Sequence, residues 1–112
     1  MTRITYLWNG RDLDFAAVGH AEYGKPDIVC ASVSTLCCTL LQCMQTLEEQ
    51  GKLARYGWGG GSGDFVLDAT VRPRARDEAD AYVRMALTGL RMLAEQYPKH
   101  VQVRERISKD SE

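Results

Sequence analysis

Residues 28–47, IVCASVSTLCCTLLQCMQTL, form a run of 20 positions without a charged side chain. The sequence predicts one helix here, because Asp27 is a good N-cap residue and Gly51 is a good C-terminal stop. One helical stripe is formed by the apolar residues Val29, Val33, Leu36, Leu40, Cys43 and Leu47. The apolar surface is widened beyond this stripe by Cys37, Leu41 and Met44. A helix that is apolar over most of its circumference needs burial on two sides, so this segment decides the fold.

The same run is long enough to cross a lipid bilayer. It also contains seven polar side chains between Ser32 and Thr46, which are too many for a lone membrane helix. We therefore expect a soluble domain without membrane contact, in which a sheet covers one side of the helix. A second copy of the chain is expected to cover the other side, which predicts a homodimer formed through helix 28–47.

Two strands are predicted before this helix. Residues 2–8 are rich in β-branched and aromatic side chains, and residues 12–18 alternate apolar and polar positions. Asn9-Gly10 between them is a strong hairpin signal, because a type I′ turn needs positive φ at both positions. A loop over residues 20–27 then leads to the helix.

The chain beyond the helix predicts a second hairpin, a second helix and a last strand. The expected elements are strands 54–58 and 64–71 around a flexible glycine turn at 59–63, a helix over 77–97, and an edge strand over 100–106. Asp77 is the predicted cap of the second helix, and Pro98 is its predicted stop. The order ββαββαβ predicts an α+β fold, a two-layer sandwich of a single sheet packed on two helices. Residues 107–112 are expected to be a frayed tail.

Length and composition limit the class of protein. A chain of 112 residues fits a single domain, residues 1–112, and its net charge of −1 argues against a general nucleic-acid binder. The N-terminus has no long apolar run after a basic segment, so we expect no signal peptide and a cytoplasmic protein. The four cysteines (Cys30, Cys37, Cys38 and Cys43) are clustered rather than spread along the chain. They therefore read as reduced thiols rather than as a disulfide framework.

A histidine and a cysteine stand at the two ends of the loop in GHAEYGKPDIVC, residues 19–30. Cys30 lies about one turn after the predicted cap, where free N–H groups and the helix dipole stabilise a thiolate and lower its pKa from about 8.5. His20 ends a strand, which can aim its imidazole at the thiol as a general base. The N–H groups of the first helical turn, including that of Cys30, are candidate donors for an oxyanion hole. On these features alone, a small buried cysteine remains the more frequent interpretation.

The string GHA…G…DIVCA, at positions 19–21, 24 and 27–31, resembles the signature of the ribosomal-processing cysteine proteases, the Prp family. The likeness extends to Val33-Ser34 and to the uncharged helix, and it covers nearly the whole chain. The resemblance implies a homodimeric cysteine endopeptidase of small α/β fold that needs no cofactor. Its implied substrate is large-subunit ribosomal protein L twenty-seven, from which it removes an N-terminal extension. His20 would be the general base and Cys30 the nucleophile.

Supporting or substrate-binding places are predicted for further residues of the signature, which are Gly19, Gly24, Asp27, Ala31 and Ser34. The two glycines allow the loop unusual backbone angles and could make it mobile. We expect Asp27 to cap the helix and to anchor the loop. Ser34 lies one turn beyond Cys30 on the same helix face.

Other functions remain open at this point. The link EYGKP after Ala21 is shorter than in most members of the family, so another target, such as a phage structural protein, would suit the same chemistry. A non-catalytic dimeric module that holds a peptide or the ribosome is a second alternative. A thiol redox protein lacks a C-x-x-C pair, and a zinc site built from His20, Cys30 and Cys37 lacks an obvious fourth ligand.

The remaining candidate residues have simpler interpretations. Cys37, Cys38 and Cys43 are predicted to be packing residues of small apolar volume. His100 is predicted to be a surface residue. The glycine turn at 59–63 lacks the lysine of a phosphate-binding loop, but it would touch a peptide substrate if it lies beside the site.

Overall fold

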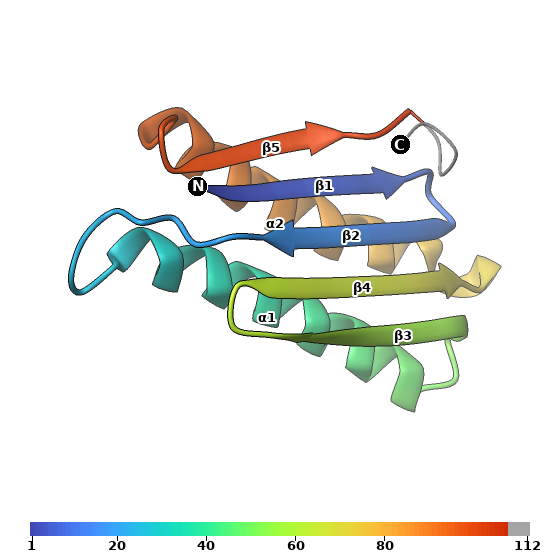
Figure 1. Ribbon diagram of the computed structural model, residues 1–112. Helices are drawn as coiled ribbons and strands as arrows, with labels where there is room; N and C mark the ends of the chain where they lie inside the picture. Colours follow the sequence, from blue (N-terminus) through green and yellow to red (C-terminus); the bar gives the residue numbers. More distant parts are fainter. Residues whose placement is uncertain (108–112) are drawn as a thin grey trace.

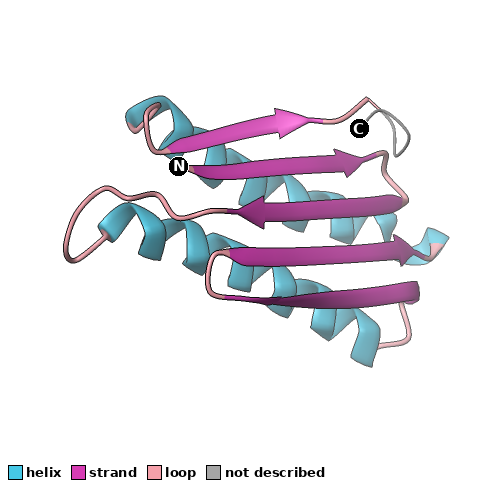
Figure 2. Cartoon of the chain, in the orientation of Figure 1, coloured by secondary structure: helices cyan, strands magenta, loops and turns pink. Residues whose placement is uncertain are grey.

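The computed structural model describes residues 1–107. Within this range the elements are β1 (Thr2–Trp8), β2 (Asp12–Val18), α1 (Ile28–Glu49), β3 (Leu53–Gly61), β4 (Asp64–Val71), the 3₁₀ turn η1 (Pro73–Ala75), α2 (Arg76–Gln96) and β5 (Val101–Glu105). The strands form one sheet in the order β3-β4-β2-β1-β5, and both helices lie on the same face of it (Figure 1; Figure 2). The predicted α+β fold, with the order ββαββαβ and one sheet on two helices, is confirmed.

The sheet is antiparallel except at one edge, where β5 pairs parallel with β1. The β1–β2 hairpin turns at the predicted Asn9-Gly10 pair. The Asn9 side-chain oxygen accepts the N–H groups of Arg11 and Asp12, and Gly10 has a φ of +89°. The central strand β2 lies between β1 and β4, so its last residues are fixed from both sides. This end of β2 leads directly into the loop that begins at His20.

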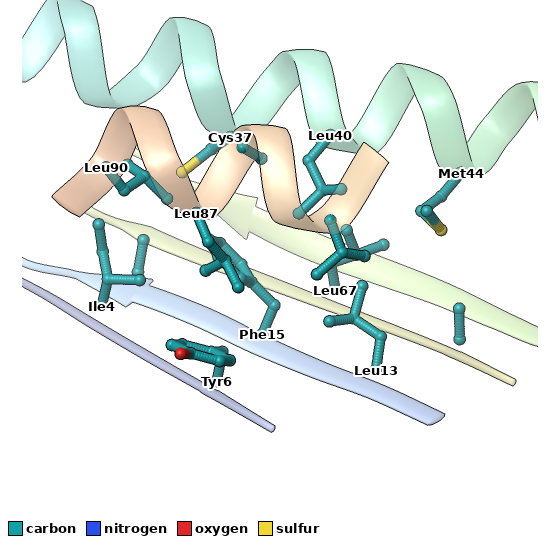
Figure 3. Packing of buried hydrophobic residues seen from close by; sticks show 14 of the residues in the cluster. Ile4, Tyr6, Leu13, Phe15, Cys37, Leu40, Met44, Leu67, Leu87 and Leu90 are labelled. Carbon is teal, nitrogen blue, oxygen red and sulfur yellow. The ribbon is translucent and has the colours of Figure 1, made fainter. Parts of the chain in front are cut away.

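The hydrophobic core lies between the sheet and the two helices (Figure 3). Helix α1 contributes Val29, Val33, Cys37, Leu40, Met44 and Leu47, all of which are buried. Each fully buried Val, Leu or Met side chain stabilises the fold by about 1.5–3 kcal/mol relative to exposure. The two helices approach closely at Gly89 of α2, where an added Cβ would lie 2.9 Å from a methyl carbon of Leu36. This packing fixes the position of α1, and therefore of Cys30, against the sheet.

The outer face of α1 is uncovered in the single chain. Most of its exposed residues are small or polar, and they include Ala31, Ser34, Thr35, Cys38, Thr39, Gln42 and Thr46. Ile28, at the start of the helix, is a large apolar residue that is also exposed. The helix has a mean hydropathy of 1.6 over its most apolar 18 residues, yet only 28% of that window is buried. Cys37 is buried as predicted and Cys43 is half-buried, but the prediction that Cys38 packs in the core is wrong for the single chain. The reason is that the sheet and α2 bury only one side of the helix.

Two local predictions differ from the structure, and a third falls almost entirely outside the described residues. Helix α2 begins at Arg76 with Ala75 at the N-cap position, and no side chain caps it, so the predicted cap Asp77 lies inside the first turn. Strand β3 continues through Gly61, because Gly59, Gly60 and Gly61 pair with β4. Three of the five residues of the predicted glycine turn are therefore strand. The predicted frayed tail, residues 107–112, lies outside the described residues except for Ile107, which is exposed.

Candidate active site

His20 directly follows the end of β2, and the backbone before it is held on two sides. The Gly19 N–H donates to the carbonyl of Gly63 at 2.9 Å, and the Thr2 hydroxyl donates to the Gly19 carbonyl at 3.3 Å. Gly19 has a φ of +96°, and a Cβ at this position would collide with the carbonyl of Met1. Only glycine fits here, so the sheet itself fixes where the His20 side chain begins.

Cys30 lies in the first turn of α1, which Asp27 begins as an N-cap residue. One carboxylate oxygen of Asp27 accepts the Cys30 N–H at 2.9 Å, and the other accepts the Tyr23 N–H at 3.1 Å. These backbone donors, that of Cys30 first, lower the pKa of Asp27. The carboxylate therefore joins the loop to the helix start. The same bond conflicts with an oxyanion-hole role for the Cys30 N–H, because that donor is already engaged.

His20 and Cys30 line the same groove, which has a volume of about 460 Å³. The groove runs between α1 and the turn end of β3 and β4, on the side of the sheet that carries the helices. Its helix wall is formed by Cys30, Val33, Ser34, Cys37, Cys38 and Leu41, and its strand wall includes Trp58, Gly60, Gly61, Ser62, Gly63, Asp64 and Phe65. A base and a thiol thus line one opening with mainly apolar walls, which suits an extended peptide.

The structure divides the predicted supporting residues into two groups. Gly19 and Ser34 line the groove, whereas Gly24, Asp27 and Ala31 do not. Gly24 lies in the loop with open space around it, and Ala31 is exposed on α1. Their positions fit a role in loop shape and helix start rather than in contact with substrate.

The sequence interpretation missed Trp58 as a residue of the site, whereas the glycine turn at 59–63, which was expected to touch a substrate if it lay beside the site, lines the groove through residues 60–63. The Trp58 side chain is 56% exposed although it belongs to the helix-covered face of the sheet, so it presents a large aromatic surface to the groove. The available signal was the glycine run around it. Strand residues without side chains leave space between an edge strand and a helix.

The loop between His20 and Cys30 contacts the connection between α2 and β5. The ring of Tyr23 makes edge-to-face contacts with Tyr97 and His100, and the His100 Nδ1 lies 2.8 Å from the Ala21 carbonyl oxygen. His100 is half-buried, so the prediction of a simple surface residue is wrong. The contact brings position 100 next to position 21, which no local pattern in the sequence indicates.

The other thiols differ from Cys30 in their surroundings. Burial raises the pKa of Cys37 to about 12, which keeps this thiol protonated, and burial also raises the pKa of Cys43. Within residues 1–107, no three His, Cys, Asp or Glu side chains come together in a way that could hold a metal ion. Cys30 is the thiol that combines a helix start with a histidine in the same groove.

A thiol on the first turn of α1 and a histidine in the same groove are the two groups that a cysteine protease requires. The chain matches the sequence model of the family described as "Cysteine protease Prp" over residues 1–102, and it belongs to this family. A search of curated proteins found no match.

Solved structures share the fold. An essential ribosomal processing protease Prp from Staphylococcus aureus, in complex with a covalently linked product peptide, matches with a TM-score of 0.73 at 22% identity, covering 95% of this chain and 100% of that chain. A structure of the Staphylococcus aureus ribosomal processing protease Prp in complex with a substrate peptide matches with a TM-score of 0.67 at 20% identity. The match covers 95% of this chain and 100% of that chain. A Streptococcus mutans protein matches with a TM-score of 0.67 at 25% identity, covering 94% and 93%.

Proposed function

We propose that this cysteine protease uses a His20–Cys30 dyad to remove the N-terminal extension of large-subunit ribosomal protein L twenty-seven. The observation that carries the proposal is that both side chains line one groove in a chain of the Prp family. The substrate is the one that the family resemblance implies. We also propose that the protein acts in the cytoplasm, a location that reduced thiols and a ribosomal target would suit.

The chemistry follows from the two side chains. His20 takes the proton of the Cys30 thiol, and the thiolate attacks the scissile carbonyl carbon. The tetrahedral intermediate collapses as the imidazolium protonates the leaving amine, which leaves a Cys30 thioester. A water molecule, deprotonated by His20, then attacks the thioester and releases the carboxylic acid product and the thiol. No cofactor takes part in these steps.

The walls of the groove suit an extended apolar segment of a substrate. Trp58 offers an aromatic face, and Val33, Leu41 and Phe65 add aliphatic and aromatic surface. The glycines at the turn end of β3 leave space for a peptide backbone to lie close to the strand. A substrate peptide that follows the groove would bring its scissile bond to Cys30 near one end.

The decisive experiment incubates the purified protein with the precursor ribosomal protein and follows cleavage by mass spectrometry. We expect Cys30→Ala and His20→Ala to lose cleavage, with the wild type forming a thioester at Cys30. Cys38→Ala is the matched control, because it removes an exposed thiol that lines the same groove. Equal cleavage by Cys30→Ala and wild type would refute the dyad. Cleavage of another protein but not of this precursor would refute the substrate alone.

We further propose that the chain forms a homodimer through the outer face of α1. This face carries a shallow hollow of about 600 Å³ lined by small and polar side chains: Ser34, Thr35, Cys38, Thr39, Gln42, Cys43, Thr46 and Tyr82. Such residues let two helices approach closely, and the absence of charge over 20 positions removes the main penalty for burying them. The opposite side of α1 packs on the sheet, so the proposed dimer would cover the helix on both sides.

Sedimentation velocity tests the dimer. Cys38→Asp places a charge at the centre of the proposed interface and should give a monomer, whereas Thr88→Asp, on the exposed side of α2, should leave the wild-type dimer. A wild type that sediments as a monomer at micromolar concentration would refute the dimer without touching the dyad.

A further inference from the structure

The ring of His20 occupies the space where a side chain of Gly63 would lie. An ideal Cβ built on Gly63 would be 2.6 Å from Nε2 of His20, 3.0 Å from Cε1 and 3.1 Å from Cδ2. These separations are shorter than ordinary van der Waals contact, so the imidazole rests directly on the backbone of the β3–β4 turn. No side chain other than hydrogen is compatible with this position of the ring.

The carbonyl of the same glycine holds the residue before His20. Its oxygen accepts the Gly19 N–H at 2.9 Å. One glycine thus contacts both the backbone that leads into His20 and the imidazole itself. His20 is exposed, so few other groups restrict its rotation.

We propose that Gly63 is a positioning residue for the general base: it provides the surface on which the His20 imidazole is held facing the groove. This inference rests on the proposed function, because it assigns His20 the role of base. It gives the glycine run at the hairpin a purpose that flexibility alone does not require. A Cβ at position 63 would displace the ring, and displacement of a catalytic group by about 1 Å can reduce the rate roughly a hundredfold.

A matched control is available in the same sheet. Gly63 has a φ of +75° and Gly10 has a φ of +89°, and both lie in hairpin turns. Substitution of either by alanine imposes the strain of a left-handed backbone on an L residue. An added Cβ at Gly10 meets nothing within 4 Å, whereas at Gly63 it meets His20. The difference between the two variants therefore isolates the contact with the ring from the cost of the turn.

The experiment compares wild type, Gly63→Ala and Gly10→Ala in two measurements. The first is kcat and KM for cleavage of the precursor ribosomal protein. The second is the pair of imidazole nitrogen and carbon resonances of His20 in NMR spectra, assigned with His20→Gln. We expect Gly63→Ala to lower kcat by roughly tenfold to a hundredfold with KM within about twofold, and to shift the His20 resonances. Gly10→Ala should keep both near wild type, while thermal unfolding shows a similar loss of stability in the two variants.

Equal kcat values in the two glycine variants would overturn the inference. So would a loss confined to KM, or a fall in kcat without any change in the His20 resonances. If the wild type does not cleave the precursor, the proposed function fails, and the NMR comparison still decides whether Gly63 positions the ring. If Gly63→Ala does not fold, Gly63→Asn takes its place, because asparagine tolerates positive φ while still adding a Cβ.

Discussion

We expect the stability of this protein to decrease at alkaline pH, because the thiol of Cys37 is buried. Its side chain is 4% exposed, and burial raises its pKa from 9.0 to about 12. The folded state keeps the proton throughout this range, whereas the unfolded chain loses it above about pH 9. The unfolded state therefore binds fewer protons, and the free energy of unfolding decreases as the pH rises from about 9 towards about 12.

The size of this effect follows from the shift. Each pH unit between the two pKa values lowers the free energy of unfolding by about 1.4 kcal/mol for one proton, so the full window reaches at most about 4 kcal/mol. A domain of this size has a total stability of about 5–15 kcal/mol, so the loss is large enough to measure. Below about pH 9 the contribution is complete and constant.

Urea unfolding at pH 8, 9, 10 and 11 measures this dependence by circular dichroism. Cys37→Ala should begin with lower stability, because it loses the packing of the sulfur atom, and its stability should decrease less steeply above pH 9. A smaller decrease remains, because the pKa of the Cys43 thiol is also raised. Cys38→Ala, which changes an exposed thiol, should retain the wild-type slope. Parallel pH profiles for wild type and Cys37→Ala would show that Cys37 does not control the alkaline transition.

Three further changes test the groove and its loop. Asp27→Ala should slow cleavage and lower the melting temperature more than Asp77→Ala, because of these two residues only Asp27 caps a helix. The pKa of Asp27 is lowered, so the cap is intact at neutral pH and its contribution is lost as the pH falls below about 3.8. Trp58→Ala should raise KM for the substrate by roughly tenfold while kcat changes little, and an unchanged KM would exclude Trp58 from the binding wall. His100→Ala should speed limited proteolysis within residues 21–26, because it removes the contact with the loop, and unaltered digestion would contradict that attachment.

The order of elements was predictable because each signal was local. Asn9-Gly10 forms its hairpin through the φ and side-chain bonds of those residues alone, and Asp27 begins α1 through a bond to the next turn. Alternation in the strands and the uncharged run in α1 report burial without knowledge of the neighbours. The same holds for His20 and Cys30, because His20 directly follows β2 and Cys30 lies in the first turn of α1.

The parts that could not be predicted depend on contacts between distant segments. The start of α2 was placed at Asp77 because a side-chain cap was expected, but η1 leads into the helix without one. Strand β3 forms a wall of the groove because it lies at the edge of the sheet beside α1. This wall could not be predicted, because no local sequence pattern indicates the order of the strands. The seat of His20 on Gly63 and the contact of His100 with the loop likewise join positions more than 40 residues apart.

The position of the His20 ring against Gly63 has a further consequence for the time at which we expect activity to arise during synthesis and folding. The two reacting side chains are close in sequence, but the imidazole lies against the turn between β3 and β4. Strand β4 pairs with β2 from Asp64 to Thr70. A chain that has not yet added β4 carries the thiol and the imidazole without their alignment. We therefore expect cleavage activity to appear only after β4 has paired with β2.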